Sequence, residues 1–375
     1  MKTNLVVLAI ALIAAINTKA QTKPVRVINQ SPKAAPNQIT ANAGANTVIN
    51  IAAVGDIMMG TSYPDAKTLP PDSGKSSFKA VAKYLKGNDI TFGNLEGTLL
   101  DKGNPASYKM HLKSKAYLFK SPVYYAKILK ETGFNLLSVA NNHASDFGDT
   151  GRRSTANVLN KYGIHYGGSE EHPTAEFTVN GVKYGFCSFS PSAHTLPILD
   201  LRNAARVIKT LKQRCDIVIV SFHGGAEGAP YEHVLRKGES YFGEKRGDVY
   251  AFAHNAVNHG ADLVFGNGPH VTRAMELYKG RLIAYSLGNF CTYKSVNIEG
   301  VCGIAPLLKV QIRKNGEFIG GKMISIRQDH DKGIEEDRLN RAAKRVIQLT
   351  KADFPDSGLD ITPNGIIQPL KVSKF

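Results

Sequence analysis

Short apolar runs alternate with amphipathic stretches along most of the chain. The apolar runs have the length of buried strands, and several of them end in Gly, Asp, Asn or His. The stretches between them place apolar residues at helical spacing. This pattern predicts strands at 48–54, 89–92, 135–140, 217–222, 261–265 and 281–287, and helices at 76–85, 121–131, 150–162, 200–213, 248–258 and 337–349.

Two Asn-Gly pairs each separate two strand-like runs, at Asn180-Gly181 and at Asn315-Gly316. Asn-Gly is favoured in two-residue hairpin turns because both positions take a positive φ. Antiparallel hairpins inside a strand–helix alternation predict an α/β fold with mixed sheets. The expected hairpin strands are 177–179 with 182–189, and 307–313 with 318–326.

The first twenty residues have the features of a secretory signal peptide. Lys2 precedes an apolar run at 5–16, which is too short to span a bilayer. Thr18 and Ala20 supply small residues before a cleavage point after Ala20. The alternative is an uncleaved N-terminal anchor. We expect cleavage of residues 1–20, which leaves a secreted or periplasmic chain with no transmembrane span.

The rest of the chain divides by composition. Residues 21–47 are rich in Pro, Asn, Ala and Thr without an apolar period, which is typical of a flexible leader. Residues 48–328 carry the strand–helix alternation and form the expected main domain. Residues 329–375 hold the expected terminal helix and a Pro-containing tail after Asp353, which we expect to pack loosely.

Composition and charge narrow the class of protein. Hydrophobic residues make up 42% and charged residues 21%, which excludes a wholly disordered chain, collagen, a coiled coil and a multi-pass membrane protein. Lys and Arg number 47 against 31 Asp and Glu, for a formal charge of +16. A positive surplus favours anionic partners such as nucleic acid, acidic polymers or phosphorylated substrates. Charge alone does not choose among them.

The chain has four cysteines, Cys187, Cys215, Cys291 and Cys302. In an oxidising compartment four cysteines allow three pairings. Cys291 and Cys302 are close in sequence, so their bridge ranks first, with four buried free thiols as the alternative. The spacing matches no zinc-binding pattern.

Polar side chains that can bind metals stand where five predicted strands end. In α/β folds, ligand sites gather at the carboxyl ends of strands, so we expect these side chains to lie close together. Carboxylate oxygen, amide oxygen and imidazole nitrogen are ligands of divalent cations. Any one of them alone is an ordinary loop residue, but the set predicts a metal centre. The set is Asp56, Glu96, Asn142 with His143, His223 and His270.

The motifs around these residues resemble the CapA family of capsule-synthesis proteins, which includes the PgsA component of poly-γ-glutamate synthesis. That family is similar to the calcineurin-like metallophosphatases, which implies a four-layer α/β/β/α sandwich of two mixed sheets. The motifs are AVGDIM at 53–58, GNLEG at 93–97, VANNH at 139–143 with Asp146 and Gly148, HGGAE at 223–227, GNGPHV at 266–271 and YSLGNF at 285–290.

The resemblance implies roles for the metal ligands. Asp56 would hold a first ion and Glu96 would bridge. The second ion would be held by Asn142, His223 and His270.

The resemblance also implies catalytic and substrate-binding roles. His143 would face the leaving group, Asp146 would orient it, and Glu227 matches an acid of the family. The expected substrate-binding residues are Asn94, Asn267 and Arg273.

The chain departs from the phosphatase pattern at the first ion. Met58 stands where these phosphatases carry the His of Asp-x-His, and Glu96 replaces their bridging Asp. Asn267 and Gly268 stand where another His usually precedes the final one. We therefore expect one firm site for Mn, Zn or Fe and a weak or absent second one.

Three functions remain open. The first is a metal-dependent hydrolase of the cell envelope, similar to phosphoesterases and involved in capsule or poly-γ-glutamate biosynthesis. Its expected partners are an anionic polymer or phosphoester substrate and the envelope synthesis machinery, but not nucleic acid. The second is a non-catalytic envelope protein that binds an anionic surface polymer. The third is a glycosidase with Glu96 and Glu227 as paired carboxylates.

Overall fold

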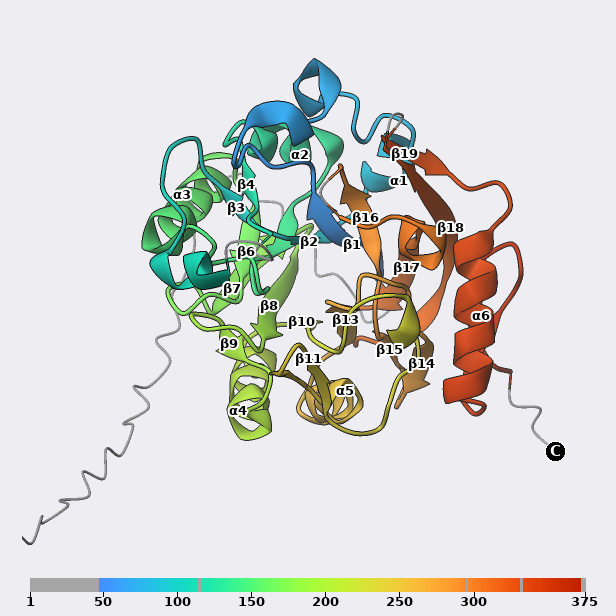
Figure 1. Ribbon diagram of the computed structural model, residues 1–375. Coiled ribbons are helices and arrows are strands. Elements are labelled where there is room, and N and C mark those ends of the chain that lie inside the picture. The colour runs from blue at the N-terminus through green and yellow to red at the C-terminus, as the bar shows by residue number, and fades with distance from the viewer. Residues whose placement is uncertain (1–46, 113–116, 295, 331–332, 372–375) are drawn as a thin grey trace, which may run out of the picture.

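Two β-sheets packed face to face form the centre of the molecule (Figure 1). The computed structural model describes residues 47–371, apart from 113–116, 295 and 331–332. The expected signal peptide, and all of the expected leader except residue 47, lie outside the described residues.

The first sheet is mixed. Its order is β20-β21-β18-β17-β1-β2-β5-β6, with β16 beside β1 and β19 beside β18. β1 runs parallel to β2 and β16 and antiparallel to β17. The strands are β1 Val48–Met58, β2 Ile90–Leu95, β5 Leu136–Ser138, β6 His165–Gly167, β16 Asn289–Thr292, β17 Ile304–Arg313, β18 Phe318–Asp329, β19 Gly333–Glu336, β20 Leu359–Ile361 and β21 Ile366–Pro369.

The second sheet is also mixed, in the order β14-β15-β13-β10-β8-β7, with β9 beside β8. β10 runs parallel to β8 and β13, while β7 and β14 pair antiparallel at the edges. Its strands are β7 Thr174–Val179, β8 Val182–Ser190, β9 Leu196–Pro197, β10 Ile217–His223, β13 Leu263–Asn267, β14 Met275–Tyr278 and β15 Arg281–Ala284. Two short pairs stand apart: β3 Thr98–Leu99 with β4 Lys120–Ser121, and β11 Glu239–Tyr241 with β12 Glu244–Gly247.

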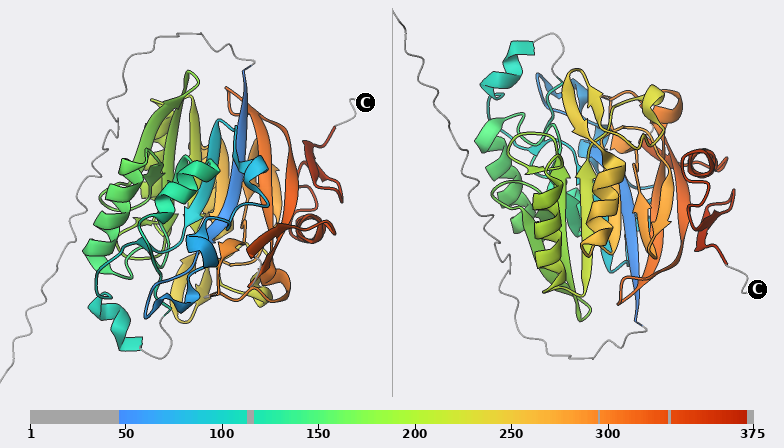
Figure 2. Two further views of the ribbon diagram at one scale, coloured as in Figure 1. Left: turned by 90° about the horizontal axis from the view of Figure 1, so that it is seen from above. Right: turned by 90° about the horizontal axis from the view of Figure 1, so that it is seen from below.

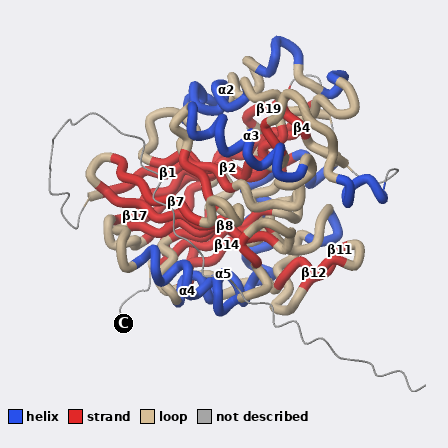
Figure 3. Tube along the Cα trace, turned by 90° about the vertical axis from the view of Figure 1, so that its left-hand side faces the viewer, coloured by secondary structure: helices blue, strands red, loops and turns tan. Residues whose placement is uncertain are grey.

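Helices cover both outer faces (Figure 3), with α2 and α3 on one side of the strands and α4 and α5 on the other. The α-helices are α1 Ala82–Leu85, α2 Tyr125–Thr132, α3 Gly148–Lys161, α4 Leu201–Lys212, α5 Val249–Asn258 and α6 Arg341–Asp353. Short 3-10 helices are η1 Ala66–Thr68, η2 Pro71–Gly74, η3 Ser107–Leu112, η4 Ala229–Tyr231 and η5 Gly300–Gly303.

Three hydrophobic cores confirm the predicted α/β/β/α layers. Apolar residues of both sheets share the central core, where the ring of Phe92 stacks on that of Phe265 at 5.3 Å. A second core joins the outer face of the second sheet to α4 and α5, and a third joins the first sheet to α2 and α3. The terminal helix α6 closes the edge of the sandwich (Figure 2), because its Ala343 and Val346 enter the central core.

Three elements differ clearly from the expected ones. The helix expected at 76–85 is regular only in α1, and the apolar run at 281–287 ends its strand at Ala284. After Ala284 the chain crosses to the other sheet and forms β16 beside β1. The tail expected to pack loosely instead supplies β20 and β21, of which β21 pairs with β18. Both Asn-Gly hairpins are confirmed, as β7–β8 and β17–β18.

The expected Cys291–Cys302 bridge is wrong, because all four cysteines are buried free thiols. Cys291 packs in the core between the first sheet and its helices, whereas Cys302 lines a pocket. Proximity in sequence therefore did not bring the two sulfur atoms together. Across residues 47–371, leaving aside the short gaps named above, no helix combines the length and the apolar character needed to cross a bilayer.

Candidate metal centre

The predicted strand-end residues gather at one edge of the two sheets. Asp56 lies in β1 and Glu96 follows β2 directly. His223 ends β10, and His270 follows β13 by three positions. The carboxyl ends of strands from both sheets therefore meet here, as expected for α/β folds.

Two glycines allow the close approach that builds this edge. A Cβ on Gly55 would lie 1.9 Å from the carbonyl oxygen of Gly288, and one on Gly266 would lie 2.2 Å from that of Tyr285. Both carbonyls belong to the segment that crosses between the sheets, and Gly288 also accepts a 2.9 Å hydrogen bond from the backbone N–H of Asp56. The Gly-Asp and Gly-Asn motifs are therefore needed for packing as well as for chemistry.

Glu96, His223 and His270 form the centre. One potential ligand atom from each lies within 4.8 Å of the others. Glu96 and His223 are fully buried, and His270 Nε2 lies 3.5 Å from Glu96 Oε1. His270 has a φ of 59°, a left-handed conformation that is costly for a non-glycine residue and is concentrated at functional sites.

Asp56 and Asn289 hold the other side of the His270 ring. His270 Nδ1 lies 3.0 Å from Asp56 Oδ2 and 3.1 Å from Asn289 Oδ1. Nε2 is therefore the ring nitrogen that faces Glu96. A carboxylate on the far nitrogen fixes the orientation of an imidazole ligand and raises its basicity.

Asn94 ties two of these residues together and does not face the solvent. It is fully buried, and its Nδ2 donates to Asp56 Oδ1 at 2.8 Å and contacts His223 Nδ1 at 3.3 Å. The expected substrate contact of Asn94 is not supported by this geometry, because its amide is bonded to residues of the centre. The contact at Nδ1 leaves Nε2 as the open nitrogen of His223.

Several buried polar atoms at this edge have no hydrogen-bond partner among the described residues. Leaving such an atom unpaired costs about 1–3 kcal/mol, and more for a charged group. A cluster of such atoms of carboxylate, imidazole and amide type fits a divalent cation such as Mn, Zn or Fe. The atoms are Glu96 Oε1 and Oε2, His223 Nε2, Asn142 Oδ1 and Asn267 Oδ1.

The protonation of the centre reflects the same crowding. Burial raises the pKa of Glu96 to about 7, although His270 and His143 act to lower it. Burial would lower the pKa of His270, but the carboxylates of Glu96 and Asp56 outweigh it and raise that pKa to about 10. Burial, with Arg246 and His270, holds the pKa of His223 well below its ordinary value. In the metal-free protein a protonated His270 therefore supplies positive charge next to the carboxylates of Glu96 and Asp56.

His143 is held by a separate set of contacts. Its Nδ1 lies 2.8 Å from Asp146 Oδ2, its ring stacks on Phe119 with centroids 4.0 Å apart, and its Nε2 lies 3.9 Å from Glu96 Oε1. Asp146 is also bound by the backbone N–H of Phe119 at 2.8 Å and by Lys109 Nζ at 2.9 Å. Burial would raise the pKa of Asp146, but His143, Lys109 and that N–H lower it below its ordinary value.

The sequence did not predict the role of residues 106–109, which hold the loop that carries His143 and Asp146. The Lys109 ammonium donates to the carbonyl oxygen of Asn142 at 2.8 Å, and the Tyr108 hydroxyl donates to that of Ser145 at 2.9 Å. A lysine and a tyrosine in a loop carry no signal of such a role. Their partners are brought to them only by the folded loop after β5.

The remaining predicted residues lie around the centre. Glu227 Oε1 pairs with the buried Arg246 at 2.9 Å. Arg273 is fully buried and makes two 2.8 Å hydrogen bonds to Glu239, which do not support the expected substrate contact. Asn267 is also fully buried, with Nδ2 donating to Ser221 and Oδ1 unpaired, which suits a ligand better than a substrate contact.

A pocket of about 260 Å³ opens onto the centre. It gives a substrate access to Glu96, His143 and His270 together. Asp56, His223 and Asn142 are not among its lining residues, so they lie behind this surface. The lining residues are Glu96, Tyr117, Phe119, His143, Glu227, Gly228, Tyr241, His270, Val296, Asn297 and Cys302.

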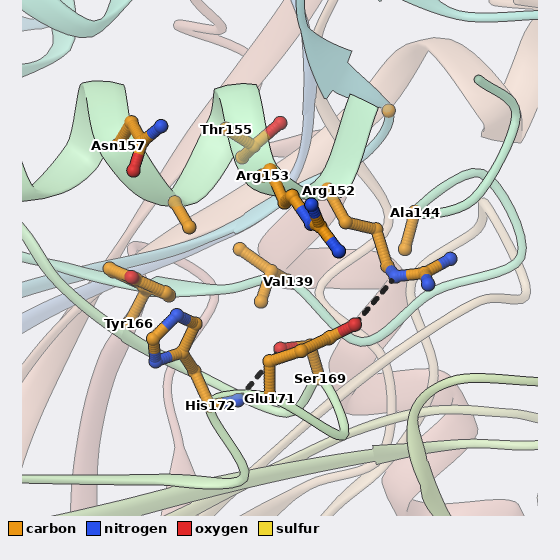
Figure 4. Close-up of a pocket in the computed structure, with 12 residues that line it drawn as sticks. Val139, Ala144, Arg152, Arg153, Thr155, Asn157, Tyr166, Ser169, Glu171 and His172 are labelled. Atoms are coloured by element: carbon orange, nitrogen blue, oxygen red, sulfur yellow. Dashed lines mark hydrogen bonds and ion pairs between the residues drawn. The ribbon is translucent and has the colours of Figure 1, made fainter. Parts of the chain in front are cut away.

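A second, smaller pocket of about 160 Å³ lies where α3 faces the loop after β5 (Figure 4). Its largest charged residue is Arg152, whose Nε donates to Glu171 at 3.3 Å and whose Nη1 donates to Ser145 at 3.0 Å. Arg152 also pairs with Asp149. The guanidinium is thus neutralised by two carboxylates.

The comparisons place the chain in a family. The model of the family described as "Bacterial capsule synthesis protein PGA_cap" matches residues 50–294, which is more than half of the chain. The chain therefore belongs to this family.

Two Bacillus proteins are similar to the chain along most of the same region. The capsule biosynthesis protein CapA of Bacillus anthracis is 29% identical over 269 residues, covering 65% of this chain and 60% of that protein. The PGA biosynthesis protein CapA of Bacillus subtilis is 29% identical over 265 residues, covering 66% of this chain and 64% of that protein. The chain thus matches a little less than two thirds of the length of these relatives.

Solved structures give only distant likenesses. A hypothetical protein from Thermus thermophilus aligns with a TM-score of 0.46 and 16% identity, over 74% of this chain and 98% of that one. The NAD nucleotidase of Haemophilus influenzae aligns with a TM-score of 0.41 and 12% identity, over 82% of this chain and 63% of that one. We draw nothing about function from likenesses at this level.

Proposed function

We propose that this member of the capsule synthesis family is a secreted or periplasmic metal-dependent hydrolase. It acts at one divalent centre on a phosphoester or an acidic surface polymer made for the capsule or as poly-γ-glutamate. The observation that carries the proposal is the buried carboxylate of Glu96, which has no hydrogen-bond partner for either oxygen and faces two histidines. A bound cation would satisfy that carboxylate and the open nitrogen of His223 together.

The ligands of this centre are Glu96, His223 and His270, with Asn142 and Asn267 offering amide oxygens. Asp56 orients His270 from behind. Asp56 was expected to hold a first ion, but its carboxylate is bonded to His270 and Asn94, which supports a positioning role instead. A bound divalent cation supplies Lewis-acid polarisation and lowers the pKa of water at the site.

The residues of the chain supply the proton chemistry. His143 lines the pocket, and its Nδ1 is held by Asp146, which leaves Nε2 directed toward Glu96 and the substrate side. In this orientation Nε2 can donate a proton to a leaving oxygen. Stacking on Phe119 keeps the ring from rotating away. Glu227 presents a second carboxylate to the pocket, neutralised on one side by Arg246.

The test is hydrolysis of bis(p-nitrophenyl) phosphate with added manganese. We expect turnover that a chelator abolishes, and a loss of about 100-fold or more in kcat for His143→Ala with metal content unchanged. His259→Ala is the matched control, because His259 is exposed at the end of α5 and bonds only its own helix. Wild-type turnover in His143→Ala would refute the assigned role.

A second candidate is a non-catalytic protein that binds an anionic polymer, and the formal charge of +16 favours it. Binding of poly-γ-glutamate would then weaken steeply with salt and survive Asp56→Ala. The glycosidase hypothesis stays a prediction. The pairing of Glu227 with Arg246 does not support it, because one of its carboxylate oxygens is already engaged.

A further inference from the structure

The lining of the pocket over the centre does not share the excess of lysine and arginine found in the whole chain. The chain carries +16, yet no lysine or arginine is among the described residues that line this pocket. Two buried arginines, Arg246 and Arg273, are paired with Glu227 and Glu239. Apart from His270 and the proposed ion, a polymer with a carboxylate on every unit would meet the carboxylates of Glu96 and Glu227 but no lysine or arginine among the described lining residues.

The smaller pocket offers no better place for a polyanion. Arg152 pairs with Glu171 (Figure 4) and with Asp149, and Arg153 pairs with Asp149 at 3.8 Å. The two arginines of the smaller pocket are thus balanced by two carboxylates.

Aromatic side chains take the place of cations around the main pocket. Tyr117, Phe119 and Tyr241 line it, and the side chain of Tyr117 is 69% exposed. Tyr241 contacts Phe242 with ring centroids 4.4 Å apart, and Phe242 is 92% exposed at the turn between β11 and β12. Exposed rings beside a polar pocket usually mark a binding surface.

Polar groups stand between these rings. Asn297 lines the pocket, and so does Glu227, of which only one oxygen is paired with Arg246. The hydroxyls of Tyr117 and Tyr241 add donors and acceptors. Flat apolar faces interleaved with amide, hydroxyl and carboxylate groups match a sugar ring, which has apolar C–H faces and hydroxyls at its edges. An acyl chain would leave these polar groups unpaired.

We propose that the pocket binds a neutral carbohydrate unit, stacked on Tyr117 and Tyr241, and that the ester bond presented to the centre is attached to that sugar. The catalytic half of this proposal rests on the proposed function, whereas the binding half does not. In the reaction the phosphorus–oxygen bond to the sugar breaks, and water supplies the oxygen that forms the new bond to phosphorus. The sugar oxygen leaves with a proton from His143, and the remaining product is a phosphate.

The test is binding without turnover. The chain has 15 tyrosines and no tryptophan, so tyrosine fluorescence reports directly on rings that a ligand covers. The probes are tetra-N-acetylchitotetraose, as a neutral oligosaccharide, and a short poly-γ-glutamate, each titrated into the metal-loaded protein. We expect saturable binding of the oligosaccharide that varies little with salt, and weaker binding of poly-γ-glutamate.

Variants locate the binding. Tyr117→Ala and Tyr241→Ala should each weaken oligosaccharide binding by about fivefold, and Tyr241→Phe should preserve stacking and most of the affinity. Tyr124→Ala is the matched control, because Tyr124 is a partly exposed tyrosine outside the pocket. Circular dichroism of each variant checks that it is folded.

Three results would overturn the proposal: no oligosaccharide binding, equal binding by the double variant Tyr117→Ala/Tyr241→Ala, or tighter binding of poly-γ-glutamate at the same site. None of these depends on catalysis. Absence of nitrophenyl-diester hydrolysis would count against the proposed function and the catalytic half of this inference, whereas absence of sugar binding would count against this inference alone.

Discussion

Two aspartate–histidine pairs lie a few ångströms from Glu96, and their surroundings differ. Asp146 is held by partners from the segment around Lys109 and Phe119, and the ring of His143 stacks on Phe119. His270 instead faces Glu96, whose two oxygens have no hydrogen-bond partner, while Asp56 lies on the far side of the His270 ring. The first pair finds its partners within the protein. The second pair belongs to a cluster of buried polar atoms, some of which would gain a partner only from a bound cation.

Because of this difference, substitutions at the first pair should affect stability, and substitutions around the second should affect metal binding. A buried polar group that has its partners contributes to stability, while an unpaired one costs free energy until a ligand binds it. Changes in the pair of Asp146 and His143 should therefore weaken the fold or the positioning of His143. Changes at Glu96 should remove metal affinity with little change in the stability of the metal-free fold.

The largest expected effect follows Glu96→Gln. This change removes a buried charge and a ligand, so manganese affinity should fall by about 100-fold or more. The free energy of unfolding of the metal-free protein should change by no more than about 1 kcal/mol, because relief of the buried charge is offset by loss of the ion pair with His270. Titration calorimetry and urea unfolding in a chelator measure the two effects. Glu131→Gln on α2, an exposed partner of Lys127, is the control. Wild-type manganese affinity in Glu96→Gln would contradict the assignment of Glu96 as a ligand, on which the comparison of the two pairs depends.

Lys109→Met tests the pair of Asp146 and His143. Asp146 loses a charged partner, so unfolding should cost about 1–3 kcal/mol less, and kcat should fall about tenfold while KM and metal content hold. Lys109→Arg should recover much of the loss, because it restores a donor. Lys102→Met, at an exposed site in the same segment between β3 and β4, should change none of these quantities. A rise in KM without loss of kcat would contradict a positioning role.

Metal affinity should depend on pH through the pair formed by Asp56 and His270. The raised pKa of His270, about 10, means that this ring is protonated below that pH in the metal-free protein. Its ion pairs with Glu96 and Asp56 stabilise that form below pH 10 and are lost as pH rises through it. A cation must displace the proton, so affinity should increase by up to about tenfold per unit from about pH 7 to about pH 9. Calorimetry in two buffers checks both the affinity and the released proton. A flat profile would mean that His270 is not a ligand.

The strand-end residues could be predicted because a polar side chain after a buried strand is a local pattern. The alternation of elements likewise predicted an α/β fold with mixed sheets, and Asn-Gly predicted both hairpins. The four layers were implied by the family resemblance. The contacts of Lys109 and Arg273 could not be predicted, since each partner is supplied by a distant segment of the folded chain. The same holds for the crossing after Ala284, where one apolar run serves two sheets.

The residues expected to meet substrate show the limit most clearly. A polar or charged residue next to a ligand motif can face either the pocket or the interior, and the sequence does not distinguish the two. Asn94 and Arg273 turn inward to hold other residues, while the exposed Tyr117 and the half-buried Tyr241 line the pocket without belonging to any motif. Burial decided which side chains a ligand can reach.

The most direct test of the central claim is a crystal structure of the protein grown with manganese, with anomalous diffraction to locate the ion. The account predicts a strong anomalous peak bonded to a Glu96 oxygen, to Nε2 of His223 and to Nε2 of His270, with Asp56 still on the far side of the His270 ring. A map without a peak between these three residues, in crystals that hold manganese elsewhere or nowhere, would contradict it.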